Sequence, residues 1–171
     1  MSRASAAAAL ALGLLLAAAG CGSAGSRAPG RLYFPARLQG LALVDSIGGD
    51  AARATLRRMH GKGVAPVDTR IGVYGGEALP TVLYVSHYAD SRTASREMRT
   101  MVERLGAGSS GFVPRRVFRA AGVQVHEAAG HGQSHYYFAR GVQLVWLAAP
   151  PDRAADMLAE LIGVAKASIP R

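Results

Sequence analysis

This chain has one cysteine, few aromatic residues and no long basic run. Each of these shortages limits the class of protein to which the chain can belong. The 171 residues include one cysteine, Cys21, and a domain of this length needs no disulfides for stability. Aromatic residues make up 6% of the sequence, so alanine, valine and leucine must fill most of the core. No run of five or six basic residues occurs, which excludes a basic interaction tail.

The charge balance is nevertheless basic, with 20 Lys and Arg against 11 Asp and Glu. This balance is compatible with anionic lipid or an acidic envelope polymer as a partner. Lys62 and Lys166 are the only lysines, and arginine usage beside abundant alanine and glycine is typical of a GC-rich genome. The pairs Arg57-Arg58 and Arg115-Arg116 are isolated, so we expect them on solvated surface.

One long apolar run stands at the N-terminus, where Arg3 precedes an uncharged stretch from Ala6 to Ala19. These roughly 14 residues would span about 21 Å as a helix, whereas a bilayer core needs about 20 residues. The run is therefore too short for a comfortable membrane span. Its length is typical of the apolar region of a secretory signal peptide.

A short motif ends this run, in the order Ala18, Ala19, Gly20 and Cys21. It resembles the lipobox of bacterial lipoproteins, in which an aliphatic residue and two small residues precede an obligatory cysteine. Ala18 stands where that family usually has leucine. The resemblance covers only the first 21 residues and implies cleavage after Gly20 and diacylglycerol on the Cys21 thiol. The alternative is a plain secretory signal with an accidental cysteine, but a lone thiol elsewhere in an exported protein would be a liability.

The resemblance divides the chain into a signal peptide at 1–20, a lipidated cysteine with a Gly/Ser-rich tether at 21–30, and one globular domain at 31–171. It implies an exported protein held by acyl chains, such as palmitate, on a bacterial membrane. The outer membrane is favoured where a cell has two, because Gly22 is not the aspartate of inner-membrane retention. Nucleic acid is not an expected partner there, and no protein partner is indicated.

Hydrophobic periodicity in the remaining chain predicts an α+β fold with a largely antiparallel sheet and about three helices. Strands are expected at 38–44, 67–74, 81–88, 112–118, 123–128, 133–138 and 142–148, and helices at 50–60, from Asp90 or Ser91 to 105, and from Pro150-Pro151 to about 165. The order β-α-β-β-α-β, then β-β-β-α, begins like a ferredoxin-like pattern. A division into two α+β halves is the less favoured alternative. Pro114 predicts an edge strand, and Tyr33-Phe34-Pro35 should dock on the domain edge.

Polar side chains concentrate between residues 123 and 138, which hold three of the five histidines. A four-residue loop at 129–132 would place His126 opposite His135, with His131 at the tip. Neutral imidazoles suit zinc or copper, so one interpretation is a metal or ligand site, to which His60 or His87 could add. The favoured interpretation is a polar cross-strand pair without a cofactor. The residues of the candidate site are Gln124, His126, His131, His135 and Tyr137.

Catalytic motifs are missing. The chain has no GxSxG elbow, and Ser134 and His135 are strand neighbours that point to opposite faces. Gly130-His131-Gly132 is too short to be a phosphate-binding loop. We therefore expect a non-enzymatic accessory or binding domain of the cell envelope. A metal- or cofactor-binding protein that uses the His-rich hairpin is the alternative, and a hydrolase is the least favoured.

Overall fold

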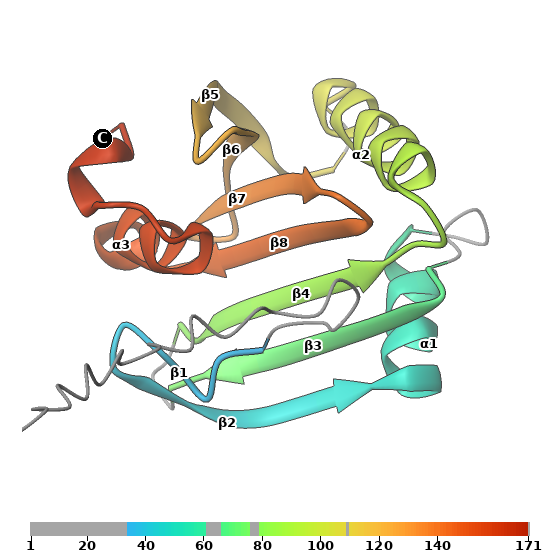
Figure 1. Cartoon of the computed structure of the whole chain (residues 1–171), viewed down its shortest axis with the longest axis horizontal. Coiled ribbons are helices and arrows are strands. Elements are labelled where there is room, and N and C mark those ends of the chain that lie inside the picture. Colours follow the sequence, from blue (N-terminus) through green and yellow to red (C-terminus); the bar gives the residue numbers. More distant parts are fainter. Residues whose placement is uncertain (1–33, 61–65, 76–78, 109, 171) are drawn as a thin grey trace, which may run out of the picture.

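The structure is a computed structural model that describes residues 34–60, 66–75, 79–108 and 110–170. The predicted signal peptide, Cys21 and the tether lie outside the described residues. Within them the chain forms an α+β fold, with three α-helices and one antiparallel sheet of eight strands (Figure 1). The strands are β1 (Arg37–Leu38), β2 (Leu41–Gly48), β3 (Asp68–Tyr74), β4 (Thr81–His87), β5 (Val113–Ala120), β6 (Val123–Gly130), β7 (Gln133–Arg140) and β8 (Gln143–Ala149). The helices are α1 (Gly49–His60), α2 (Ser91–Gly106), α3 (Pro151–Ile162) and a short 3-10 turn at Lys166–Ser168.

The sheet runs in the order β1-β2-β3-β4-β8-β7-β6-β5. Every neighbouring pair is antiparallel, including β2 and β3 on either side of α1. The predicted antiparallel sheet is thus confirmed. The ferredoxin-like start is not, because a split βαβ unit runs the two strands around its helix in parallel.

The first predicted strand, at 38–44, is wrong in its bounds. Gln39 and Gly40 adopt φ of 47° and 77°, which makes a tight turn between β1 and β2. Leu38 pairs with Leu41 across this turn. The chain therefore folds back on itself where one continuous strand was expected.

The helix boundaries follow local chemistry. Asp90 is the N-cap of α2, and its side chain accepts a hydrogen bond of 2.7 Å from the Thr93 backbone N–H. Pro151 occupies the first turn of α3, where a missing N–H costs nothing, and Gly163 ends that helix with φ 74°. The predicted starts of α2 and α3 are confirmed.

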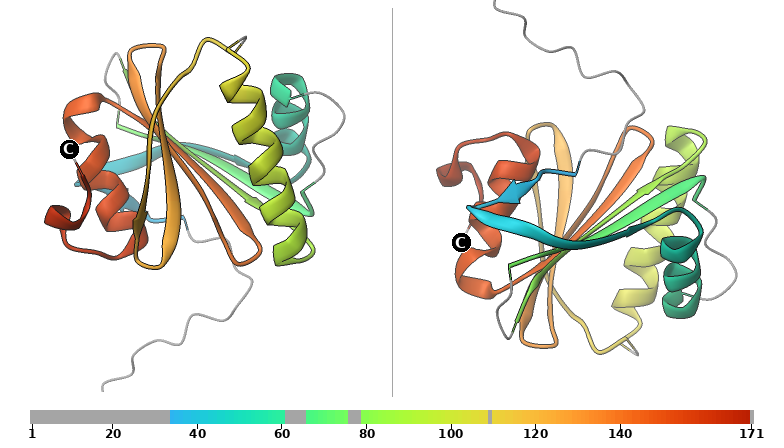
Figure 2. Two further views of the ribbon diagram at one scale, coloured as in Figure 1. Left: turned by 90° about the horizontal axis from the view of Figure 1, so that it is seen from above. Right: turned by 90° about the horizontal axis from the view of Figure 1, so that it is seen from below.

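Helices cover both faces of the sheet. In the two views of Figure 2, α3 stands on one side and α1 and α2 stand on the other. The larger core cluster lies between α3 and the sheet and includes Leu83, Phe138, Leu147 and Leu158, while the smaller one, with Met98 and Tyr137, lies under α2. The α1–α2 face is therefore less completely filled than the α3 face.

Phe34 docks on the face of the sheet over β3, an interior strand, whereas Tyr33-Phe34-Pro35 was expected at the domain edge. Its ring stacks on Tyr74 at 6.3 Å between centroids, and the Tyr74 hydroxyl donates to the Pro35 carbonyl at 2.9 Å. Gly72 provides the room, because a Cβ there would lie 2.0 Å from Phe34 Cε1. Tyr33 lies outside the described residues.

β5 forms one edge of the sheet, as Pro114 predicts. Its pairing with β6 shifts register between Pro114 and Arg116. Among the helices of the described residues, none is long and apolar enough to cross a membrane.

Candidate functional site

A cavity of about 920 Å³ lies on the face of the sheet that carries α1 and α2. This volume is in the range of small-molecule sites, which are typically about 300–1,000 Å³. The cavity is bordered by both helices, by β4 and β8, and by the turn between β6 and β7. Side chains of the sheet form its floor and side chains of the two helices form its walls.

The floor of the cavity is built from three cross-strand pairs. Residues directly opposite each other in an antiparallel ladder share a face. Three such pairs of β4 and β8 line the cavity: Val82 with Ala148, Tyr84 with Trp146, and Ser86 with Leu144. The floor is therefore mainly apolar and aromatic, because both strands alternate in the same register.

The walls come from one face of each helix. Leu56, Met59 and His60 project from α1, and Thr100, Met101, Arg104 and Leu105 project from α2. Spacings of three and four residues keep these side chains on one side of each helix. The walls are thus mainly apolar, and His60 and Arg104 place an imidazole and a guanidinium among the apolar side chains.

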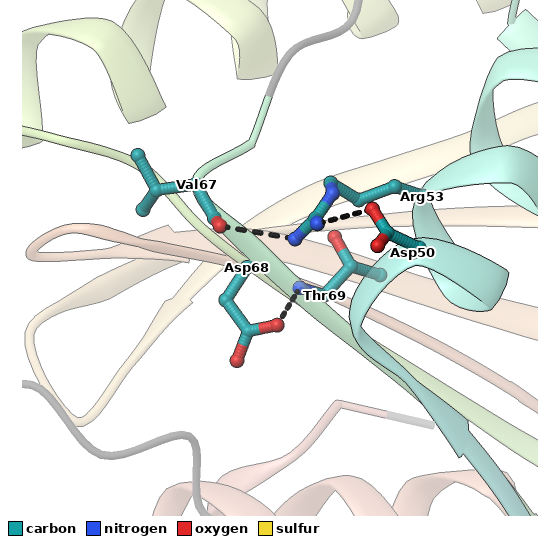
Figure 3. A network of polar contacts seen from close by, with 5 residues as sticks. All are labelled: Asp50, Arg53, Val67, Asp68 and Thr69. Carbon is teal, nitrogen blue, oxygen red and sulfur yellow. Dashed lines mark hydrogen bonds and ion pairs between the residues drawn. The ribbon is translucent and has the colours of Figure 1, made fainter.

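Polar contacts hold α1 in place as a wall. Figure 3 shows Arg53 of α1 between Asp50 and the Val67 carbonyl, to which its guanidinium donates at 2.6 Å and 3.2 Å. Asp68 in turn accepts a hydrogen bond of 2.8 Å from the Thr69 N–H at the start of β3. Arg104 of α2 donates to the His60 carbonyl at the end of α1 at 3.3 Å, so the walls are tied to each other as well as to the sheet.

The hairpin of the predicted histidine site has a shorter turn than expected. β6 and β7 are joined by His131 and Gly132, which adopt φ of 51° and 78°. His126 therefore faces Tyr137, and His135 faces Ala128. The expected pairing of His126 with His135 is wrong by two residues. A shift of two keeps every side chain on its predicted face.

His135 is buried and both of its ring nitrogens are occupied. Nδ1 accepts a hydrogen bond of 3.1 Å from the Trp146 indole, and Nε2 lies 3.0 Å from the Gly130 carbonyl. This pattern requires the neutral Nε2–H form of the ring. Burial lowers the pKa of His135, with the nearby His131 acting in the same direction. His135 thus fixes the Trp146 indole in the cavity floor through this hydrogen bond.

His126 belongs to a ladder of rings outside the cavity. It stacks on Tyr137 at 5.4 Å, and Tyr137 stacks on Trp146 at 4.8 Å. Gln124 Nε2 lies 3.0 Å from His126 Nε2. Burial lowers the pKa of His126, which favours the neutral imidazole. None of Gln124, His126 and Tyr137 lines the cavity, so the predicted site is divided in two.

His131 is exposed at the turn, and the Phe112 ring contacts both His131 at 5.1 Å and His135 at 4.8 Å. His60 borders the cavity at the end of α1, whereas His87 lies on β4 opposite Asp68 and Gln143. In the part of the chain that the structure describes, no three His, Cys, Asp or Glu side chains are grouped as a metal would need. Zinc or copper at the His-rich hairpin remains an untested prediction that this geometry does not favour.

Sequence reasoning missed the residues of β4 and α2 that line the cavity. Tyr84 and Ser86 alternate along β4 and Tyr88 follows directly after it, while Glu97, Met101 and Arg104 follow a helical spacing along α2. Both patterns are visible in the sequence. The sequence does not indicate that these residues of β4 and α2 line one cavity, because their proximity depends on the order of the strands in the sheet.

The chain was also compared with known proteins. Comparison with protein-family models, with curated proteins and with solved structures finds no significant match in any of the three.

Proposed function

We propose that this protein is a lipid-anchored, non-enzymatic binding protein of the bacterial cell envelope that holds a small, largely apolar ligand between α1 and α2. The single observation that carries the binding function is the cavity of about 920 Å³ above β4 and β8. The anchoring part of the proposal rests on the lipobox-like sequence that ends at Cys21.

The composition of the cavity supports a ligand-binding role. Ligand sites combine an apolar and aromatic lining with a few polar groups that fix orientation. Here the rings of Tyr84, Trp146 and Phe112 meet the aliphatic side chains of Leu56 and Leu144. A hydrophobic ligand would remove this surface from water at roughly 25 cal/mol per Å².

The polar groups of the cavity support binding rather than catalysis. His135 has both nitrogens committed to Trp146 and Gly130, so it has no free nitrogen to act as a base. The Ser86 hydroxyl lies 3.2 Å from that of Thr69, with no imidazole in this contact. Among the described lining residues no hydroxyl is hydrogen-bonded to an imidazole, and the cavity is partly open to solvent.

The experiment is a titration of the neutral fluorescent probe N-phenyl-1-naphthylamine into the soluble Cys21→Ala protein. Trp146 is the only tryptophan of the chain and borders the cavity, so its emission reports occupancy directly. We expect saturable binding of one probe per chain with quenching of Trp146. Absence of saturable binding would overturn the proposal.

Variants that fill the cavity provide the matched control. Ala148→Phe places a ring on the cavity floor, and Thr100→Phe places one on the α2 wall. Each should weaken probe binding by at least about tenfold, because the ring occupies the volume that the probe needs. Ala42→Phe, at an exposed position of β2, makes the same kind of change elsewhere and should leave binding unaltered.

A further inference from the structure

Glu97 is a charged side chain of the cavity that is largely withdrawn from water. Its side chain is 19% exposed, compared with 57% for its neighbour Arg96. Arg104, which also borders the cavity, is exposed and donates to the His60 carbonyl. An exposed charge at the rim is screened by water and contributes little, so the carboxylate dominates the inner electrostatics.

The Glu97 carboxylate has weak partners in the protein. Arg96 Nε lies 3.7 Å away, but adjacent residues on a helix do not face each other, and this pair is half exposed. Within the described part of the chain, no side chain or backbone group donates a hydrogen bond to this carboxylate. Because the side chain is only partly exposed and no hydrogen-bond donor of the described residues contacts its carboxylate, a ligand that supplies positive charge would give Glu97 a partner that the protein does not.

Aromatic residues line the same cavity as Glu97. Tyr88 is buried, and burial together with Glu97 raises its pKa to about 12, so the phenol stays neutral at neutral pH. Tyr84 follows on the same strand face, with Trp146 directly opposite it. The π systems of Tyr and Trp attract organic cations, and the attraction grows as water is excluded.

From these features we propose that the cavity selects an organic cation with an apolar tail. The cationic nitrogen lies at Glu97, between Tyr84 and Tyr88, and the tail follows the floor toward Val82 and Ala148. From His87 to Val82 strand β4 extends about 16 Å at 3.3 Å per residue, which accommodates a medium-length alkyl chain. This inference rests on the proposed function and adds the charge and shape of the ligand.

Three probes with the same tail test the charge preference. Octyltrimethylammonium, octanol and octyl sulfate are titrated below their micelle concentrations, with Trp146 emission and calorimetry as readouts. Octyltrimethylammonium should bind at least about tenfold more tightly than octanol, because only the cation gains cation–π attraction and an ion pair with the Glu97 carboxylate. Octyl sulfate should bind most weakly of the three.

Isosteric variants of α2 assign the preference to one residue. Glu97→Gln should reduce the affinity for octyltrimethylammonium toward that for octanol, leaving only the contribution of the aromatic rings, and should leave octanol binding unchanged. Glu103→Gln removes the same charge from an exposed position of the same helix and should change neither. Thermal unfolding of both variants checks that they fold.

The outcomes separate the two proposals. If octanol binds but octyltrimethylammonium binds no better, or if Glu97→Gln keeps the full preference of the parent, the cation proposal is overturned and the apolar binding site stands. Tighter binding of octyl sulfate would also overturn it and would point to Arg104 instead. If none of the three probes binds, the proposed function itself fails.

Discussion

At the scale of single residues, Gly72 shows how one missing side chain admits another. A Cβ at this position would lie 2.0 Å from Phe34 Cε1 and 2.8 Å from Leu43 Cδ1. Side-chain carbons do not approach this closely, so any larger residue must displace the Phe34 ring. The docking of the first described residues on the sheet therefore depends on a glycine in the middle of β3.

We predict that Gly72→Ala lowers the free energy of unfolding by about 1–3 kcal/mol, measured by urea denaturation, because overpacking forces Phe34 off Tyr74. Gly106→Ala is the control, since nothing lies within 4 Å of a Cβ at that helical position. In the background of Phe34→Ala the effect of Gly72→Ala should shrink. Equal effects in both backgrounds would mean that the clash with Phe34 is not the cause.

Two buried imidazoles predict how stability depends on pH. Burial lowers the pKa values of His126 and His135 below the ordinary 6.5 in the folded chain. The unfolded chain then binds protons more readily, so stability is highest above pH 6.5 and falls as the pH drops toward the lowered values. The urea midpoint should therefore be lower at about pH 5.5 than at about pH 7.5.

His135→Gln tests the origin of this pH dependence. Its amide oxygen can still accept from the Trp146 indole, but the side chain does not titrate. The fall of the urea midpoint between the two pH values should be smaller in this variant than in the parent. A parent protein that gains stability on acidification would contradict the sign worked out here.

At the scale of elements, tight turns set the register of the second half of the sheet. Ala121 and Gly122 adopt φ of 50° and 74° between β5 and β6, as His131 and Gly132 do between β6 and β7. Both are patterns of type I′ turns, which favour Asn-Gly because the first residue must tolerate a left-handed backbone. Ala121 is therefore strained where it stands.

Ala121→Asn should raise the free energy of unfolding by on the order of 0.5 kcal/mol, because asparagine tolerates the left-handed conformation better than alanine. Chemical denaturation at neutral pH provides the measurement. Ala107→Asn is a matched control at an ordinary φ of −70°, and no gain is expected there. An equal gain at both positions would attribute the effect to side-chain polarity and not to the turn.

The same turns explain what the sequence could and could not predict. The helices and most strands were predicted, because apolar periodicity and capping residues such as Asp90 and Pro151 are local signals. The His126–His135 pairing was wrong because a four-residue loop was assumed where His131-Gly132 makes a two-residue one. The strand at 38–44 was wrong for the same reason, since Gln39-Gly40 was read as part of a strand.

At the scale of the whole molecule, the order of the strands decides where the site is. β4 pairs with β8, although about sixty residues separate them in the chain, and this pairing brings Tyr84 opposite Trp146. Local patterns carry no information on such a long-range choice. The candidate site predicted from the sequence therefore stayed within one hairpin, while the cavity draws on three strands and two helices.

The proposed lipidation of Cys21 predicts how the full chain partitions between membrane and water. The parent protein should carry the lipid and partition into the detergent phase of a Triton X-114 extraction, because two or more acyl chains give stable membrane attachment. Cys21→Ala should carry no fatty acid by mass spectrometry, whereas Ser23→Ala in the adjacent segment should keep it. An aqueous parent protein, or a mature form without fatty acid by mass spectrometry, would contradict lipidation.

The edge strand β5 has a consequence for behaviour at high concentration. An open sheet offers backbone donors and acceptors to any chain that meets its rim, which is how strand-to-strand polymers begin. On β5 a proline interrupts the row of donors, a register shift bends it, and Arg115 and Arg119 charge it. Two copies that meet rim to rim would therefore bring like charges together along a broken ladder, which should keep concentrated solutions free of fibrils.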